Sequence, residues 1–176
     1  VNAVQMIQTG ESQCVLAGGV EQMSQVPYVM RGVRFGGIRM GNGELEDYLN
    51  SSLTDQYSGI PMAITAENLG EKYGITRAQC DEFSLLSQSR CKEATAKNYF
   101  AAEMKPYKIE TKKGVVEIAK DEHPKPDVTL EKLQAMKSLF KKDGLVTAAT
   151  ASGIVDGAAT SLLCSESFAK AKGLKP

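Results

Sequence analysis

The chain has 176 residues, in which 21 lysine and arginine residues balance 21 aspartate and glutamate residues, so its formal net charge is zero. This balance gives no general reason to expect a nucleic acid or another acidic partner. Hydrophobic residues make up 42% of the chain, and no apolar run approaches the ~18 residues of a membrane-spanning helix. The length suits one ordinary domain with a sizeable core.

The N-terminal residues predict the end of an amphipathic helix followed by a strand. Apolar residues recur at helical spacing over 1–7, and Gly10 is a typical helix stop. Because the chain begins in mid-helix and without methionine, we expect it to be truncated, with no targeting segment in view and room for one to have been lost upstream. The run 14–17 predicts a short buried strand, which Gly18 and Gly19 are expected to end.

The middle of the chain predicts an irregular stretch and then two helices. The irregular stretch reaches about Gly43, and residues 44–53 suit one or two helical turns. Pro61 suits the first position of a helix that runs to Tyr73 and ends at Gly74. Thr76 and Gln79 have the spacing of a capping box, so a second helix is predicted from there to about Lys97.

The last part of the chain predicts a hairpin, a final helix and further strands. Residues 104–109 and 115–119 read as two strands joined by a turn. After a proline-containing loop, the expected elements are a short helix over 129–137, buried strands over 145–150 and 158–164, and a helix over 165–173. The order of helix, strand, long mixed insertion, strand and helix predicts an α/β domain with an α+β excursion between two of its elements.

The four cysteines give no sign of a metal or disulfide framework. None forms a CxxC motif, and no histidine has the spacing of a metal ligand. We interpret Cys14, Cys80, Cys91 and Cys164 as reduced, small, buried hydrophobic residues. This interpretation favours a reducing compartment such as the cytosol or the mitochondrial matrix.

A segment rich in small residues, 147–160, is the first candidate for binding. It contains Ser152 between Ala151 and Gly153. Small side chains allow a large ligand to lie against the backbone, and the serine hydroxyl can bond an amide of an extended ligand. A tight strand crossing with a satisfied serine explains the same composition, and composition alone favours that explanation.

Three further segments are weaker candidates. In 138–144, Phe140 and the lysines that follow it suit the border of a nucleotide-bearing ligand, although a helix end with solvated lysines is more common. Glycines and arginines over 33–41 suit phosphate, but the strand-to-helix context of a phosphate loop is missing. His123, the single histidine, falls in a proline-rich loop among acidic residues and reads as a solvated side chain rather than a general base.

Taken in order, eight segments of the chain resemble the thiolase family, and the resemblance extends over almost the whole chain. Pro61 and the sequences at 34–36 and 53–56 make it most similar to the mitochondrial 3-ketoacyl-CoA thiolases of fatty-acid β-oxidation. The eight segments are 16–24, 53–55, 62–68, 73–77, 121–126, 129–133, 140–144 and 151–157.

The resemblance implies an incomplete thiolase-like fold with three parts. Residues 1–24 would be the remainder of the N-terminal αβα domain, 25–150 an α+β loop domain that cradles coenzyme A, and 151–176 the return to the N-terminal domain. Ser152 would bond the pantetheine amide, and Lys125 would lie near the nucleotide. The residues expected to line the pantetheine and acyl path are Ala148, Leu139, Phe140, Leu53 and Met62.

The resemblance also implies acyl transfer through a cysteine thioester, in which coenzyme A cleaves a 3-ketoacyl-CoA to acetyl-CoA and a shortened acyl-CoA. The family nucleophile would lie just before Val1, and the other catalytic motifs in a second half, so the chain alone is expected to be inactive. Coenzyme A is a substrate, and no metal or permanently bound cofactor is expected. Ala149 and Thr150 depart from the family's usual Gly-Asn, and the β-carbon of Ala149 is expected to crowd the site.

Two other functions remain open from the sequence. The chain could be a short, non-catalytic protein that binds acyl-CoA or interacts with a thiolase, or, with weaker support, a sterol-carrier-type relative. The resemblance implies a dimer or tetramer for the full-length protein and the mitochondrial matrix as its location, with the peroxisome or cytosol as alternatives. It does not give the preferred acyl chain length.

Overall fold

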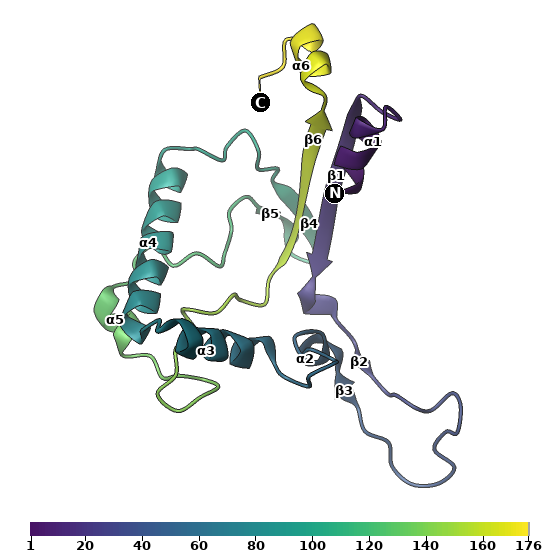
Figure 1. Ribbon diagram of the computed structural model, residues 1–176, viewed down its shortest axis with the longest axis vertical. Coiled ribbons are helices and arrows are strands. Elements are labelled where there is room, and N and C mark those ends of the chain that lie inside the picture. Colours follow the sequence, from purple (N-terminus) through teal and green to yellow (C-terminus); the bar gives the residue numbers. More distant parts are fainter. Residues whose placement is uncertain (176) are drawn as a thin grey trace. The chain divides into compact units, whose positions relative to one another are not determined.

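The computed structural model describes residues 1–175, which divide into two compact units (Figure 1). Unit 1 combines Val1–Val26 with the segment that begins at Ile154, so it is built from two distant parts of the sequence. Unit 2 is the single continuous segment Pro27–Gly153. Helices and strands both occur in the two units. None of the helices within the described residues combines the length and the apolar character needed to cross a membrane.

Unit 1 is a two-stranded antiparallel sheet with short helices at its ends. The strands pair along their whole length, from Cys14 opposite Cys164 to Gln22 opposite Asp156. Helix α1 contacts both strands, and the ribbon shows the strands side by side (Figure 1). The elements of unit 1 are α1 (Asn2–Gln8), β1 (Cys14–Gln22), η1 (Met23–Gln25), β6 (Asp156–Cys164) and α6 (Glu166–Lys172).

The prediction that Gly18 and Gly19 end the first strand is wrong, because β1 continues to Gln22. Gly18 lies opposite Thr160, and a β-carbon added there would stand 2.6 Å from the carbonyl oxygen of Ala159. A glycine inside a strand often marks such a close approach of two backbones. Gly18 therefore permits the pairing with β6 and does not interrupt the strand.

The expectation that both of these strands are buried is also wrong. Leu16, Val20 and Leu162 are exposed, whereas Cys14 and Cys164 are half-buried. Side chains alternate between the two faces of a strand. Ala17, Ser161 and Leu163 line a hollow beside the first residues of α1, so the face that carries Leu16 and Leu162 is the one away from α1. A two-stranded sheet with one covered face leaves the other in contact with solvent.

A polar contact fixes the end of the strand pair. The carboxylate of Asp156, the first residue of β6, accepts hydrogen bonds from the hydroxyl (2.5 Å) and backbone N–H (2.9 Å) of Ser24. The hydroxyl bond, followed by the backbone bond, lowers the pKa of Asp156 below its ordinary value. The bonds favour the ionised carboxylate and so hold η1 against the start of β6.

Unit 2 contains four helices, of which α3 and α4 have the predicted ends, whereas α2 and α5 are shorter than expected over 44–53 and 129–137. The side chain of Asp47 caps α2 by accepting from two backbone N–H groups. Gly74, in the left-handed conformation with φ of 64°, ends α3. The capping box between Thr76 and Gln79 is present and starts α4, which confirms that prediction. The helices are α2 (Tyr48–Ser52), α3 (Met62–Tyr73), α4 (Arg77–Ala96) and α5 (Leu130–Gln134).

The strands of unit 2 form two small antiparallel pairs. Strands β2 (Tyr28–Val29) and β3 (Glu46–Asp47) pair at the base of the irregular stretch. Strands β4 (Tyr107–Thr111) and β5 (Gly114–Ile118) form the predicted hairpin, with its first strand three residues later than expected. Both strands of the hairpin are exposed on both faces.

The prediction of a buried strand over 145–150 is half right, because the start of the segment is buried but it forms a turn. Val146 is 8% and Thr147 0% exposed. The backbone N–H of Thr150 points to the carbonyl oxygen of Thr147 at 3.2 Å, which closes the turn. Together with Leu133 of α5, these residues form the small core of unit 2, which also contains the charged residues Glu67 and Asp81.

Candidate functional site

All seven residues expected to contact coenzyme A lie in unit 2, and all seven are exposed. Leu53 and Met62 are neighbours in space, since the backbone N–H of Met62 donates to the carbonyl oxygen of Leu53 at 2.9 Å. An isolated bridge between Thr54 and Pro61 strengthens this junction. Met62 is the first residue of α3, so the junction places two apolar side chains at the start of that helix. The seven exposed residues are Leu53, Met62, Lys125, Leu139, Phe140, Ala148 and Ser152.

A closed loop presents Leu139 and Phe140. The N–H of Leu139 donates to the carbonyl oxygen of Val146 at 2.9 Å, and the hydroxyl of Ser138 donates to the carbonyl oxygen of Gly144 at 2.7 Å. These two bonds hold the ends of the loop together. The loop therefore meets the buried segment 144–147 at its base and leaves Leu139 and Phe140 in solvent.

The carboxylate of Glu67 holds the base of this loop in place. The sequence did not mark Glu67 as a functional residue. The side chain of Glu67 is 3% exposed and accepts from the N–H groups of Leu145 (2.8 and 2.9 Å) and Val146 (2.8 Å). A β-carbon on Gly144 would collide with this carboxylate, so only glycine leaves room for it. Every buried polar side-chain atom in the part of the chain that the structure describes has a hydrogen-bond partner.

A signal for Glu67 does exist in the sequence. Along α3, Ala63 and Ile64 are half-buried and Glu67 and Gly70 are buried. These positions recur at three- and four-residue steps, which marks one face of a helix. A carboxylate on that inward face needs hydrogen-bond donors, because an unpaired buried charge is costly. In the sequence, Ala63, Ile64 and Gly70 stand at these steps from Glu67, which is compatible with an inward carboxylate but does not identify its donors.

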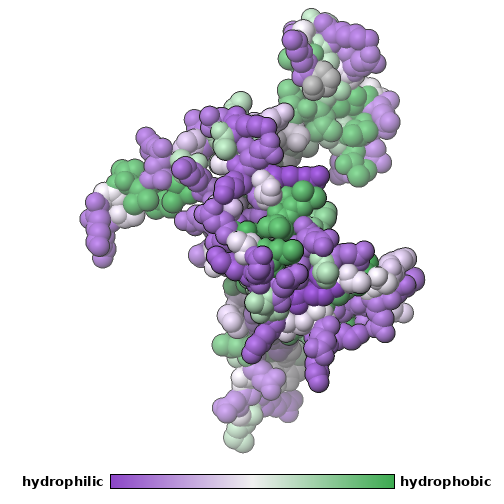
Figure 2. Space-filling view, turned by 90° about the vertical axis from the view of Figure 1, so that its left-hand side faces the viewer, coloured by the Kyte–Doolittle hydropathy of each residue, from purple (hydrophilic) through white to green (hydrophobic). Residues whose placement is uncertain are grey.

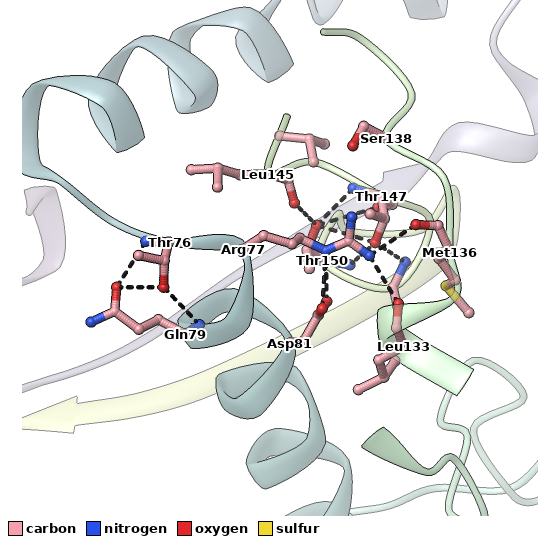
Figure 3. A network of polar contacts seen from close by, with 12 residues as sticks. Thr76, Arg77, Gln79, Asp81, Leu133, Met136, Ser138, Leu145, Thr147 and Thr150 are labelled. Carbon is pink, nitrogen blue, oxygen red and sulfur yellow. Dashed lines mark hydrogen bonds and ion pairs between the residues drawn. The ribbon is translucent and has the colours of Figure 1, made fainter. Parts of the chain in front are cut away.

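Two threonines shape the turn that precedes Ser152 (Figure 3). The Oγ1 of Thr150 accepts from the backbone N–H of Thr147 at 2.8 Å and donates to the carbonyl oxygen of Leu145 at 3.0 Å. The Oγ1 of Thr147 accepts from the N–H of Ala149 at 3.2 Å. The hydroxyl of Thr150 therefore holds the turn closed.

We expect Thr150→Val to lower the free energy of unfolding by about 1–3 kcal/mol, because it leaves the buried N–H of Thr147 without its acceptor. Valine keeps the shape of threonine and removes the hydroxyl. Urea denaturation followed by circular dichroism measures the change. Thr95→Val is the matched control, since the Thr95 hydroxyl bonds the carbonyl oxygen of Cys91 on an exposed helix surface. Equal losses in the two variants would contradict the role of Thr150.

Arg77, the first residue of α4, stabilises the segment around Leu133 and Met136 (Figure 3). The Nε of Arg77 donates to both carboxylate oxygens of Asp81 at 3.0 Å, and its Nη2 donates to the carbonyl oxygens of Leu133 and Met136, each at 2.9 Å. Asp81 is 1% exposed. Arg77 thus joins the start of α4 to the end of α5 and the residues that follow it. The i, i+4 spacing of Arg77 and Asp81 is visible in the sequence, but the carbonyl partners are not.

Lys125 and the loop around it lie against α4 and against Gly153 of the small-residue segment. The backbone N–H of Lys125 donates to the side-chain oxygen of Gln88, on α4, at 2.8 Å. The ring of His123 lies against Gly153, where an added β-carbon would collide with it. Although His123 is exposed as expected, it is in contact with the residue next to Ser152.

Exposed charges border the apolar residues. Lys141 pairs with Glu71 at 2.8 Å, and this hydrogen bond, with the attraction between the charges, lowers the pKa of Glu71 and raises the pKa of Lys141. Near Leu53, bonds from the backbone N–H and the hydroxyl of Ser58 lower the pKa of Asp55. A hollow of about 480 Å³, lined by residues that include Lys137 and Lys142, adjoins this loop.

The surface of unit 2 combines exposed apolar side chains with charges. Apolar side chains reach the surface among polar ones (Figure 2). Within residues 1–175, no three His, Cys, Asp or Glu side chains are placed so as to hold a metal ion. The four cysteines are free, but they are half-buried rather than fully buried as expected. Burial raises the pKa of the Cys80 thiol, which disfavours the thiolate needed for nucleophilic attack.

Known proteins resemble this chain along its whole length. Residues 1–167 match the family described as the thiolase N-terminal domain. The chain is 48% identical to the human mitochondrial 3-ketoacyl-CoA thiolase over 176 residues, which is 100% of this chain and 44% of that protein. It is 44% identical to a probable acetyl-CoA acyltransferase of Staphylococcus epidermidis, over 99% of this chain and 44% of that protein.

The fold agrees with solved structures of such proteins. The crystal structure of the human mitochondrial 3-ketoacyl-CoA thiolase in complex with CoA matches with a TM-score of 0.84 and 47% identity, over 99% of this chain and 43% of that chain. The acetyl-CoA acetyltransferase of Bacillus anthracis matches with a TM-score of 0.88 and 43% identity, over 99% and 44%. The chain therefore spans less than half the length of these relatives and has a partial form of their fold.

Proposed function

Because the chain belongs to the thiolase family, we propose that it is part of an acyltransferase that cleaves 3-ketoacyl-CoA with coenzyme A, and that its own part is to hold coenzyme A. The products of this reaction are acetyl-CoA and an acyl-CoA shortened by two carbons. The similarity to a thiolase whose structure was solved with CoA supports the ligand. Coenzyme A enters this proposal as a substrate.

The observation that carries the proposal is the exposed Ser152, two residues after a turn whose first residues are buried and hydrogen-bonded. Ser152 follows the turn that Thr147 and Thr150 close, and Glu67 fixes the residues before that turn. A hydroxyl on a fixed backbone loses little conformational freedom when it bonds a ligand amide. Pantetheine is an extended chain with two amides, and the small side chains around Ser152 leave its path open.

The other six residues take the roles that the chemistry of coenzyme A requires. The small side chain of Ala148 leaves room for the pantetheine chain. Lys125, exposed and next to the contact of His123 with Gly153, is a cation for the phosphates of the nucleotide. Apolar surface for the pantetheine and acyl chains comes from Leu53, Met62, Leu139 and Phe140.

The bond-making step needs groups beyond these residues. The resemblance to thiolases implies that none of the four free cysteines is the family nucleophile, and the ring of His123 lies against Gly153. We therefore infer that the chain alone does not catalyse acyl transfer. By the same family argument, we propose that the full-length protein forms a homo-oligomer and works in the mitochondrial matrix; the names of several relatives describe those proteins as mitochondrial.

Titration of the purified chain with coenzyme A by calorimetry tests the proposal. We expect saturable binding, and we expect Ser152→Ala to weaken it about fivefold, since one hydrogen bond contributes about 1 kcal/mol. Ser89→Ala is the matched control, because Ser89 is an exposed serine on α4 and is not among the residues proposed to contact coenzyme A.

Folding must be measured beside binding. Circular dichroism and thermal melting of each variant separate a lost contact from a lost fold. Equal binding by the native chain and Ser152→Ala would exclude the role of Ser152, and the absence of binding by a folded chain would overturn the proposal that these residues hold coenzyme A. Thiolase turnover by the isolated chain would refute the inference that its catalytic groups lie elsewhere.

A further inference from the structure

We propose that Cys14 and Cys164 form a thiol pair that closes to a disulfide across β1 and β6 when a disulfide oxidant such as oxidised glutathione is present. The two cysteines are free and half-buried, and they stand directly opposite each other in the sheet of unit 1. The proposal concerns a modification of unit 1 and does not depend on coenzyme A binding.

The hydrogen bonds around the pair define its geometry. The N–H of Ser165 donates to the carbonyl oxygen of Gln13 at 3.0 Å, so Gln13 and Ser165 are a hydrogen-bonded pair of the antiparallel ladder. Such pairs alternate with pairs that exchange no hydrogen bond. Cys14 and Cys164, one step further along, are therefore a non-hydrogen-bonded pair.

The backbone of Cys14 agrees with this assignment. Its carbonyl oxygen accepts from the hydroxyl of Ser12 at 2.8 Å, and its N–H donates to the same hydroxyl oxygen at 3.4 Å. Both groups thus bond a side chain of the preceding segment and do not bond β6. In a non-hydrogen-bonded pair, the backbone groups point away from the partner strand, as they do here.

This geometry suits a disulfide. The α-carbons of a non-hydrogen-bonded antiparallel pair are about 4.5 Å apart, with the side chains on the same face. Disulfides span α-carbon separations of roughly 4.4–6.8 Å. The two thiols need only rotate about their side-chain bonds to meet. They lie on the face away from α1, the face on which Leu16 and Leu162 are exposed, so a small oxidant has access to them.

The other two cysteines have no such partner. Cys80 and Cys91 both lie on α4, eleven positions apart, which separates them by three turns of helix. Burial raises the pKa of Cys80, so its thiolate is disfavoured. Cys80 and Cys91 therefore serve as an internal control for the Cys14–Cys164 pair.

The reaction balances as thiol–disulfide exchange. The thiolate of one cysteine attacks oxidised glutathione, breaks its S–S bond and releases one glutathione thiolate. The second cysteine then attacks the mixed disulfide, forms the Cys14 Sγ–Cys164 Sγ bond and releases the second glutathione. The two protein thiols lose two electrons in total, glutathione gains them, and the two protons leave with the released glutathione.

The test is oxidation of the full 176-residue chain by a graded ratio of oxidised to reduced glutathione. We expect the loss of two of the four free thiols, a linked peptide that joins Cys14 to Cys164 in a non-reduced digest, and full recovery with dithiothreitol. The closed form should melt about 5–10 °C higher, because the bond restricts the unfolded chain. Cys14→Ser and Cys164→Ser should each abolish the linked peptide, whereas the double variant Cys80→Ser with Cys91→Ser should retain it.

Repeating the oxidation in urea shows whether the fold, rather than random encounter of the thiols, brings Cys14 and Cys164 together. We expect the preference for Cys14–Cys164 to disappear there, since cysteines close in sequence then meet more often. The proposal is overturned if the native chain yields mainly glutathione adducts, if Cys80–Cys91 is the main product, or if the pairing is the same with and without urea.

Discussion

Replacing Glu67 by alanine will lower the free energy of unfolding by about 2–5 kcal/mol and abolish coenzyme A binding at concentrations that saturate the native chain. The change leaves the N–H groups of Leu145 and Val146 without acceptors, and each unsatisfied group costs about 1–3 kcal/mol. It also opens a cavity beside Gly144. Urea denaturation and calorimetric titration measure the two effects.

Two control variants show which property of Glu67 matters. Glu71→Ala removes a carboxylate one turn later on α3, where it forms an exposed pair with Lys141, and should lower stability far less than Glu67→Ala, because exposed ion pairs contribute little. Glu67→Gln keeps one acceptor oxygen but faces the N–H of Leu145 with an NH₂ group, so we expect an intermediate loss. If Glu67→Ala were no more harmful than Glu71→Ala, the carboxylate would not be the anchor of this segment.

Replacing Arg77 by alanine will lower the free energy of unfolding by about 3–5 kcal/mol, because it leaves the carboxylate of Asp81 buried without its partner. The carbonyl oxygens of Leu133 and Met136 lose a donor at the same time. Urea denaturation gives the loss, and amide hydrogen exchange should show that protection falls first at the start of α4 and in α5.

Arg90→Ala tests whether any arginine on α4 has this effect. Arg90 is exposed on the same helix, so its removal should change the free energy of unfolding by less than about 0.5 kcal/mol. Arg77→Lys retains the charge but not the planar fork that reaches a carboxylate and two carbonyls together, so we expect most of the loss to remain. Full stability of Arg77→Lys would mean that charge alone suffices.

Local signals predicted the helices of this chain well. The capping box at Thr76, the cap at Ser165 and the left-handed glycines Gly74 and Gly173 lie where the sequence placed helix ends. These signals succeed because a helix end satisfies its backbone groups with residues only a few positions away. The resemblance to thiolases is confirmed for the same chain by the family match over residues 1–167.

Contacts between distant residues explain what the sequence did not reveal. Gly18 looks like a strand end until β6 is placed beside it. The apolar run 145–150 looks like a strand because nothing nearby indicates that Glu67, on another helix, takes the N–H groups of Leu145 and Val146. Of the binding residues, the structure brings Leu53 and Met62 together, whereas their contact with coenzyme A stays a prediction.

The pairing of β1 with β6 has a consequence for the order in which the chain folds during synthesis. Ser24 and Asp156, which bond each other in unit 1, are 132 residues apart. At a synthesis rate of roughly 5–20 residues per second, the ribosome needs roughly 7–26 s to add the residues between them. The whole of unit 2 leaves the ribosome in that interval, while β1 waits without its partner strand. The backbone N–H and C=O groups of β1 then form an unpaired strand edge, which makes β1 a segment that a chaperone can protect.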